Sequence, residues 1–285
     1  MLDPGHPAAA SAPIGVFDSG VGGLSVLRAL RAALPTETFI YVADSCHAPY
    51  GDRSPGFVEA RARAVARFLA HYRAKAMVIA CNTASVLVAS ELRGVHSLPI
   101  VAMEPAIKPA ALATTSKVVL VLATTSTIRS RSVARLCSAH GAGIRIILQA
   151  CPGLADQVER AEFGSAATLR LLREYILPGL AEGADTIVLG CTHYAFLAGE
   201  IAEITGPSVA IVESSAAVAR QLARVLPITA PAAGPSAATF YTSGSTALMA
   251  SFLTSIEEPF DQVFALPEVE SFSRFRLRLH PPQED

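Results

Sequence analysis

The chain has 285 residues, of which 51% are apolar, and this is long enough for two domains with sizeable cores. Its 23 basic and 24 acidic residues give a net charge of −1, which offers no electrostatic support for nucleic acid or an anionic membrane surface as a partner. No apolar stretch reaches the roughly 18 residues of a membrane span, so no membrane partner is predicted.

Five cysteines are spread widely along the chain. Their odd number and wide spacing disfavour a small disulfide-bonded scaffold. Residues 1–13 are rich in Ala and Pro and do not follow the charged-then-apolar pattern of a secretory signal. We therefore expect a mobile amino-terminal tail over residues 1–13 and a reduced, cytoplasmic setting.

Strands are predicted wherever a short apolar run ends in polar residues, at 14–17, 39–43, 77–79, 100–103, 118–122, 144–149, 187–189 and 209–212. Helices are predicted between them, from apolar residues spaced three and four apart, at 24–34, 58–72, 84–93, 130–140, 169–182 and 216–226. The segment 46–53 contains Pro49 and Gly51 and predicts a loop. Residues 228–234 predict a Pro/Ala-rich linker, followed by a last strand, helix and strand at 239–242, 247–254 and 272–279.

This alternation predicts an α/β fold with mainly parallel sheets, each covered by helices on both faces. We place the passage from a first to a second unit at residues 104–105. Polar residues gather after most of the strands, where ligands bind in open α/β sheets. Two such strand ends, one from each unit, can close on a single small ligand.

Two segments of the chain share one pattern. Residues 77–83 read MVIACNT and residues 187–193 read IVLGCTH, so Cys81 and Cys191 both follow a buried strand. The repeat predicts two thiols that face one site. Helix-start N–H groups would lower the pKa of each thiol. Burial of cysteine as a small apolar residue is the simpler explanation for either position taken alone.

Asp18 and His193 also follow predicted strands and are candidate proton carriers for the two thiols. Each has a simpler explanation, a turn cap for Asp18 and a core position for His193. Residues 19–23, SGVGG, can hold an anion with backbone N–H groups. They do not form a dinucleotide-binding motif, because Ser25 occupies the place of its third glycine.

No feature of the sequence predicts a cofactor or a metal ion. A phosphate-binding Gly-Lys-Ser/Thr loop is absent, and no lysine ends a strand where it would hold pyridoxal phosphate. Cys191 and His193 lack the further Cys or His residues that would complete a zinc site. Two thiols without a cofactor fit inversion of an amino-acid α-carbon, in which one group removes a proton and the other returns one on the opposite face.

Four ordered motifs carry a resemblance to a known family. IGVFDSGVGGLSVL at 14–27, ADSCHAPYGDR at 43–53, IACNTAS at 79–85 and LGCTHYAFL at 189–197 resemble motifs of the cofactor-independent glutamate racemases, within the aspartate/glutamate racemase family. The resemblance implies an isomerase that interconverts L- and D-glutamate for peptidoglycan synthesis. It implies two doubly wound domains related by a pseudo-twofold axis, with the active site between them. The domains would span 14–105 plus 213–285, and 106–212, and a homodimer is expected.

The resemblance also implies roles for particular residues. Cys81 and Cys191 would be the acid/base thiols, with Asp18 assisting Cys81 and His193 assisting Cys191. The residues implied to bind glutamate, or to lie near it, are Asp18, Ser19, Tyr50, Gly51, Asn82, Thr83, Thr124, Thr127, Glu159, Thr192 and His193. Two alternatives remain open: an aspartate racemase, hydantoin racemase or maleate isomerase on the same scaffold, and a non-catalytic binding protein that kept the fold.

Overall fold

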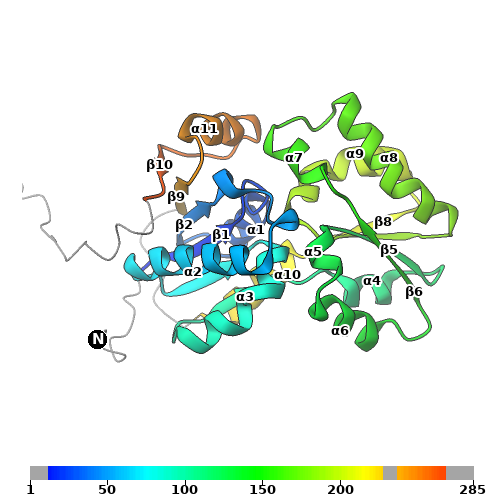
Figure 1. Ribbon diagram of the computed structural model, residues 1–285, viewed down its shortest axis with the longest axis horizontal. Coiled ribbons are helices and arrows are strands. Elements are labelled where there is room, and N and C mark those ends of the chain that lie inside the picture. Colours follow the sequence, from blue (N-terminus) through cyan, green and yellow to red (C-terminus); the bar gives the residue numbers. More distant parts are fainter. Residues whose placement is uncertain (1–11, 227–235, 268–285) are drawn as a thin grey trace, which may run out of the picture.

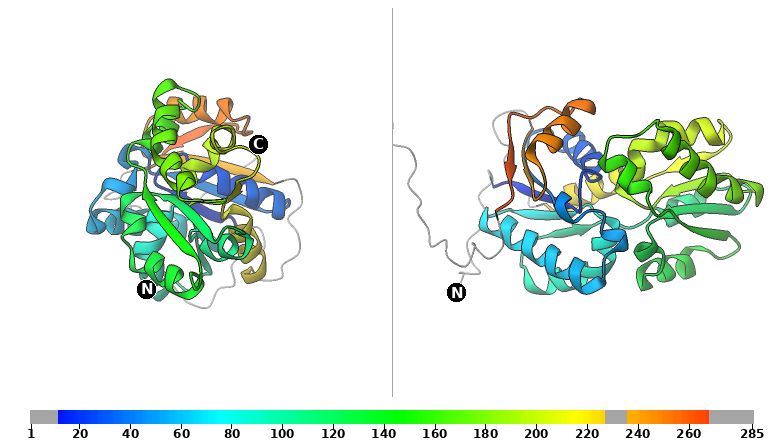
Figure 2. Two further views of the ribbon diagram at one scale, coloured as in Figure 1. Left: turned by 90° about the vertical axis from the view of Figure 1, so that its right-hand side faces the viewer. Right: turned by 45° about the horizontal axis from the view of Figure 1, so that its top comes forward.

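The structure, a computed structural model, describes residues 12–226 and 236–267. Its strands are β1 (Ile14–Asp18), β2 (Thr38–Ala43), β3 (Ala76–Ile79), β4 (Ile100–Ala102), β5 (Val118–Ala123), β6 (Arg145–Ala150), β7 (Thr186–Leu189), β8 (Ala210–Val212), β9 (Ala237–Thr242) and β10 (Val263–Ala265). They form two sheets that lie in two lobes side by side (Figure 1), and the right-hand view in Figure 2 shows the same division.

The helices alternate with these strands. They are α1 (Leu24–Ala33), α2 (Pro55–His71), α3 (Asn82–Val95), α4 (Ile107–Ala113), α5 (Thr125–Ile128), α6 (Arg131–His140), α7 (Leu154–Glu159), α8 (Ala166–Ala181), α9 (Ala198–Thr205), α10 (Ser215–Val225) and α11 (Thr246–Ser255). Short 3₁₀ turns form η1 (Ser45–His47), η2 (Tyr50–Asp52) and η3 (Thr192–Leu197).

Both sheets repeat one strand order. The first is β10-β9-β2-β1-β3-β4 and the second is β6-β5-β7-β8, and every described pairing in them is parallel. Strands β2-β1-β3-β4 of the first sheet therefore correspond to β6-β5-β7-β8 of the second. In each set the chain starts at an inner strand and then continues on both of its sides, which creates a crevice at the carboxyl ends of β1 and β3 and of β5 and β7.

Apolar residues cover both faces of each sheet. In the first sheet, one face packs on α1 and α10 and the other on α2 and α3. In the second, one face packs on α8 and α9 and the other on α4 and α6. One continuous cluster joins the lobes, because Leu24 and Leu27 of α1 belong to the same core as Tyr194 and Leu197 of η3. The lobes therefore meet through apolar packing beside the strand ends.

Local sequence signals start several of the helices. Ser54 accepts the Phe57 N–H at the start of α2, where Pro55 follows it. Ser130, Ser165 and Ser245 cap α6, α8 and α11 in the same way. Each side chain satisfies an N–H that has no partner inside its own helix, while proline at the first position has no N–H to satisfy.

The predicted α/β class, with two parallel sheets, is confirmed, but several elements differ in detail. Helices α4, α5, α7 and α9 were not predicted, because each is too short to show a repeated apolar stripe. Helix α3 begins at Asn82, not at residue 84, because Cys81 is its N-cap. Strand β10, at Val263–Ala265, was also missed.

Some predictions fall where the structure gives no description. The linker at 228–234 and the strand at 272–279 lie outside the described residues, as does nearly all of the tail at 1–13. Helix α10 packs on the sheet that contains β1, and strands β9 and β10 join that sheet, so the chain returns to its first lobe at α10. The exact domain limits stay a prediction.

Candidate active site

The two cysteines lie at equivalent points of the two sheets. Asp18 ends β1, and Cys81 follows the neighbouring strand β3. In the other sheet Thr124 follows β5, and Cys191 follows the neighbouring strand β7. Each pair therefore flanks the point at which the strand order reverses, where ligands bind in this class of fold.

These strand ends meet at one cavity between the lobes. Most of the residues proposed from the sequence line it: Ser19, Tyr50, Gly51, Cys81, Asn82, Thr83, Thr124, Cys191, Thr192 and His193. Pro49 and Ala155 also line it and were not among the candidates. Asp18, Thr127 and Glu159 lie behind the lining and hydrogen-bond to it.

Cys81 caps helix α3. Its Sγ accepts the Ala84 N–H at 3.4 Å, in the helix-start position expected from the sequence. The expected fall in its pKa is wrong, however. Burial raises the pKa of the Cys81 thiol, and the nearby Asp18 carboxylate raises it further, so both outweigh the helix-start N–H. In the absence of substrate Cys81 is therefore a protonated thiol at neutral pH.

A hydrogen-bonded chain links Cys81 to Asp18 through Ser19. The Cys81 S–H points to Ser19 Oγ at 3.7 Å, and the Ser19 O–H donates to Asp18 Oδ1 at 3.1 Å. The other carboxylate oxygen, Oδ2, accepts the Thr192 O–H from the second lobe at 3.0 Å. Burial raises the pKa of Asp18, while His193 and Thr192 oppose that effect. Asp18 thus reaches Cys81 through an intervening hydroxyl.

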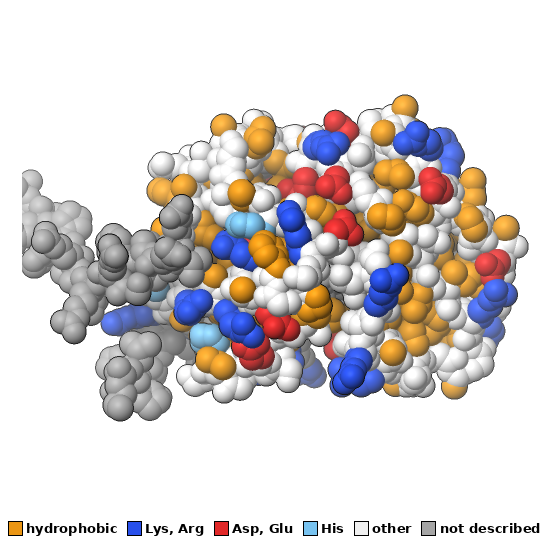
Figure 3. Space-filling model, in the orientation of Figure 1, with side chains coloured by type: hydrophobic (Ala, Val, Ile, Leu, Met, Phe, Trp, Pro, Cys, Tyr) orange, Lys and Arg blue, Asp and Glu red, His pale blue; other side chains and the backbone are white. Residues whose placement is uncertain are grey.

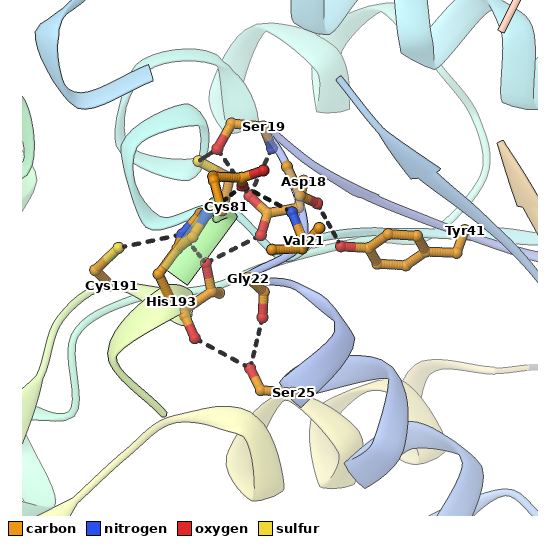
Figure 4. Close-up of polar contacts among 12 residues, drawn as sticks. Asp18, Ser19, Val21, Gly22, Ser25, Tyr41, Cys81, Cys191 and His193 are labelled. Carbon is orange, nitrogen blue, oxygen red and sulfur yellow. Dashed lines mark hydrogen bonds and ion pairs between the residues drawn. The ribbon is translucent and has the colours of Figure 1, made fainter. Parts of the chain in front are cut away.

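Cys191 has a different neighbour. Its Sγ lies 3.6 Å from His193 Nδ1 (Figure 4), and His193 Nε2 lies 2.6 Å from Glu159 Oε1. Burial lowers the pKa of His193, but its hydrogen bonds to Cys191 and Glu159 and the charges of these two groups together outweigh burial, so the pKa lies well above its usual value. His193 is therefore protonated at neutral pH and directs an N–H toward each of these two partners.

The glycine-rich loop of the first lobe closes over this histidine. The Val21 N–H donates to Glu159 Oε1 at 2.9 Å, so one carboxylate holds both the loop and the ring. A Cβ atom at Gly20 would overlap the Glu159 carboxylate, and one at Gly22 would overlap the His193 ring. These glycines allow the close approach of the two lobes. The anion that the sequence predicted for the backbone N–H groups of this loop is, in the structure, the Glu159 carboxylate of the same chain.

Tyr50 is held by a buried carboxylate that the sequence analysis left without a role. Its hydroxyl donates to Asp44 Oδ2 at 2.6 Å, and Arg61 of α2 forms two bonds to the same carboxylate, at 2.9 and 2.7 Å. The pKa of Asp44 is lowered, because Arg61 and Tyr50 together outweigh its burial. Asp44 follows a predicted strand and was visible as a strand-end polar residue, whereas Arg61 carries no local signal.

Three threonines form a connected group across the lobes. Thr83 Oγ1 lies 2.9 Å from Thr124 Oγ1 and 3.2 Å from Thr127 Oγ1. The Ser126 O–H adds a second link, donating to the Gly51 carbonyl at 2.6 Å. Nearby, Asn82 Oδ1 is buried and has no hydrogen-bond partner among the described residues. A buried acceptor without a partner is costly in a folded protein, which marks Asn82 as a ligand-binding candidate.

Comparison with known proteins places this site in a family. Residues 14–222 match the model of the Asp/Glu/hydantoin racemase family. The chain belongs to this family. It is 52% identical over 217 residues to the glutamate racemase of Pseudomonas entomophila, covering 76% of this chain and 82% of that one. It is 53% identical over 214 residues to the glutamate racemase of Methylococcus capsulatus, covering 75% and 79%. The predicted isomerase class is thereby confirmed.

Solved structures of racemases share the fold. A glutamate racemase of Bacillus anthracis superimposes with a TM-score of 0.81 at 30% identity, covering 90% of this chain and 97% of that one. The Escherichia coli glutamate racemase, solved with L-glutamate and an activator, UDP-MurNAc-Ala, gives a TM-score of 0.79 at 32% identity, covering 89% and 98%. An aspartate racemase of Picrophilus torridus is 18% identical with a TM-score of 0.51, which shows a common fold only.

Two further observations bear on the sequence predictions. Within residues 12–226 and 236–267, no helix of this racemase-family member is long and apolar enough to cross a membrane. In the same ranges, no three His, Cys, Asp or Glu side chains gather in a way that would hold a metal ion. Figure 3 shows basic and acidic side chains interspersed over one face. The absence of a cofactor and the homodimer stay predictions.

Proposed function

We propose that the protein interconverts L- and D-glutamate by transferring protons between the substrate α-carbon and two cysteines on opposite faces. The observation that carries this proposal is that Cys81 and Cys191, from equivalent strand ends of two lobes, line one cavity. A single acid/base group would exchange the α-proton on one face without inverting it. Two groups that face each other across the substrate are what inversion requires.

The two thiols reach their working states by different routes. Cys81 passes its proton through the Ser19 hydroxyl to the Asp18 carboxylate, whose raised pKa suits it to hold that proton. Protonated His193 points Nδ1–H at Cys191 and so stabilises negative charge on that sulfur. A thiolate removes the α-proton, the bonding pair stays on the substrate as a carbanion, and the opposite thiol gives its proton to the other face.

The remaining lining residues supply substrate contacts. We assign to Asn82 Oδ1 a hydrogen bond from the substrate ammonium, because this buried oxygen has no partner among the described residues. The hydroxyl groups of Ser19, Thr83, Thr124 and Thr192 lie around the same cavity and offer donors to carboxylate oxygens. We favour glutamate over aspartate as the substrate, because the relatives that are 52% and 53% identical to this chain carry the name glutamate racemase. We assign the enzyme to cytoplasmic supply of D-glutamate for peptidoglycan.

The decisive experiment measures both enantiomers of glutamate and of aspartate in deuterium oxide. Each glutamate enantiomer should yield product with solvent deuterium at the α-carbon, while aspartate should turn over far more slowly. Cys81→Ser and Cys191→Ser should each abolish inversion, because a hydroxyl is a far weaker acid and base than a thiol at neutral pH. Near-normal racemisation by Cys191→Ser would refute the two-thiol mechanism. Turnover of aspartate faster than that of glutamate would refute the assignment of glutamate as the substrate.

A further inference from the structure

Tyr41 of β2 is a buried tyrosine that the mechanism does not use. Its side chain is fully buried, and its hydroxyl donates to the Gly20 carbonyl at 2.7 Å (Figure 4). The Gly20 carbonyl and the Val21 N–H belong to one peptide group, which is planar. That same Val21 N–H donates to Glu159 at 2.9 Å. Tyr41 and Glu159 therefore hold the two ends of a single rigid unit.

This peptide group lies at the start of a longer chain of contacts. Glu159 lies 2.6 Å from His193 Nε2, and His193 Nδ1 lies 3.6 Å from Cys191 Sγ. The chain runs from the core of the first lobe to the thiol of the second. Without Tyr41, the loop peptide could rotate and carry the Val21 N–H away from Glu159. A hydroxyl bonded to the carbonyl end also polarises the peptide and strengthens the N–H end as a donor.

We propose that Tyr41 is a positioning residue for racemisation: its hydroxyl fixes the Gly20–Val21 peptide so that Glu159 holds His193 against Cys191. Tyr41 itself does not line the cavity and touches no reacting atom. The kinetic readouts rest on the proposed two-cysteine mechanism, whereas the state of His193 can be measured without turnover.

The test compares Tyr41→Phe with a matched control, Tyr175→Phe. Both replacements remove one tyrosine hydroxyl that donates to a backbone carbonyl, since Tyr175 donates to the Pro152 carbonyl at 2.8 Å. Tyr41→Phe should lower kcat by roughly tenfold, the size expected for one lost hydrogen bond, and more in one direction than in the other. Tyr175→Phe also loses one hydrogen bond, but outside the chain of contacts to Cys191, so its kcat should stay within about twofold of the parent. Equal rates for both variants would overturn the proposal.

A second readout follows His193 directly. In protein labelled with ¹⁵N-histidine, the His193 signal is assigned by its loss in His193→Asn. Its titration should move to lower pH in Tyr41→Phe, because a less firmly held Glu159 raises the pKa of His193 less. An unchanged titration would overturn the proposal whatever the kinetics. A shifted titration with a failed two-thiol test would retain the Tyr41 link and reject only the mechanism.

A double-mutant cycle separates positioning from general stability. If Tyr41 acts through Glu159, adding Tyr41→Phe to Glu159→Gln should cost less than about twofold in kcat, whereas independent effects would multiply. Incorporation of 4-aminophenylalanine at position 41 restores an N–H donor on the same ring and should recover the rate and the titration. Multiplying effects, or no recovery in a folded protein, would refute the role assigned to the hydroxyl.

Discussion

Replacing Gly20 of the first lobe by alanine should displace Glu159 of the second lobe and lower the rate of racemisation. The backbone of Gly20 is not in the left-handed region, so alanine is conformationally allowed, but its Cβ would overlap the Glu159 carboxylate. Glu159 must then move away from the Val21 N–H at 2.9 Å and from His193 Nε2 at 2.6 Å. A hydrogen bond to a charged group contributes about 1.5–3 kcal/mol.

The magnitude follows from the contact with His193. If that hydrogen bond supports the transition state, its loss lowers kcat by roughly ten- to a hundredfold, since each 1.36 kcal/mol is tenfold in rate. The rate can be followed by circular dichroism from either enantiomer. The ratio of kcat/KM values in the two directions must stay fixed by the equilibrium, so unequal effects will appear in kcat and KM separately.

The control for this substitution is Gly94→Ala in helix α3. An added Cβ there meets no atom within 4 Å, and alanine in a helix is more stable than glycine by about 0.5–1 kcal/mol. Gly94→Ala should therefore keep full activity. A Gly20→Ala protein that is folded and as active as Gly94→Ala would show that the Glu159–His193 contact does not matter for the reaction.

Three other outcomes are expected. Alkylation that inactivates the enzyme should map to Cys81 or Cys191 and be slowed by glutamate; inactivation with both thiols unmodified would contradict their role. The raised pKa of His193 stabilises the fold below its unfolded value of 6.5, and this stabilisation is lost as pH rises through the folded pKa. In urea, unfolding free energy should thus fall with rising pH more steeply in the parent than in His193→Asn, and equal slopes would contradict this. Arg61→Met removes the guanidinium from buried Asp44, which keeps its contacts with Tyr50 and His47, so unfolding free energy should drop by about 3–5 kcal/mol, and a drop below about 1 kcal/mol would refute that account.

The sequence revealed the two thiols because their signal is local. A short apolar run followed by Cys81 or Cys191 is visible within ten residues, and parallel sheets bring strand ends together whatever the details of packing. Tyr41 and Arg61 gave no such signal. Each acts through a contact with a residue from another element, and a tyrosine inside a strand or an arginine on a helix is an ordinary residue in its own segment.

The pKa of Cys81 was predicted in the wrong direction for a related reason. The sequence shows that a helix starts beside the thiol, but burial and the proximity of Asp18 depend on the packing of both lobes. Glu159 entered the candidate list only through the family resemblance, since nothing in its own segment separates it from a surface residue. Its position against His193 depends on Gly20 and Gly22 allowing the loop to approach.

Near-symmetry of the fold does not make the surroundings of Cys81 and Cys191 alike. Cys81 and Cys191 follow equivalent strands, yet one caps an α-helix and leads through Ser19 to a carboxylate, while the other precedes a 3₁₀ turn and faces a protonated imidazole. Thr192 joins the two arrangements by donating to Asp18 from the second lobe. A racemase must present a base and an acid at the same moment, and two identical thiol environments would favour one protonation state for both. In the proposed mechanism, the unequal partners of Cys81 and Cys191 give each sulfur its own route to gain or lose a proton.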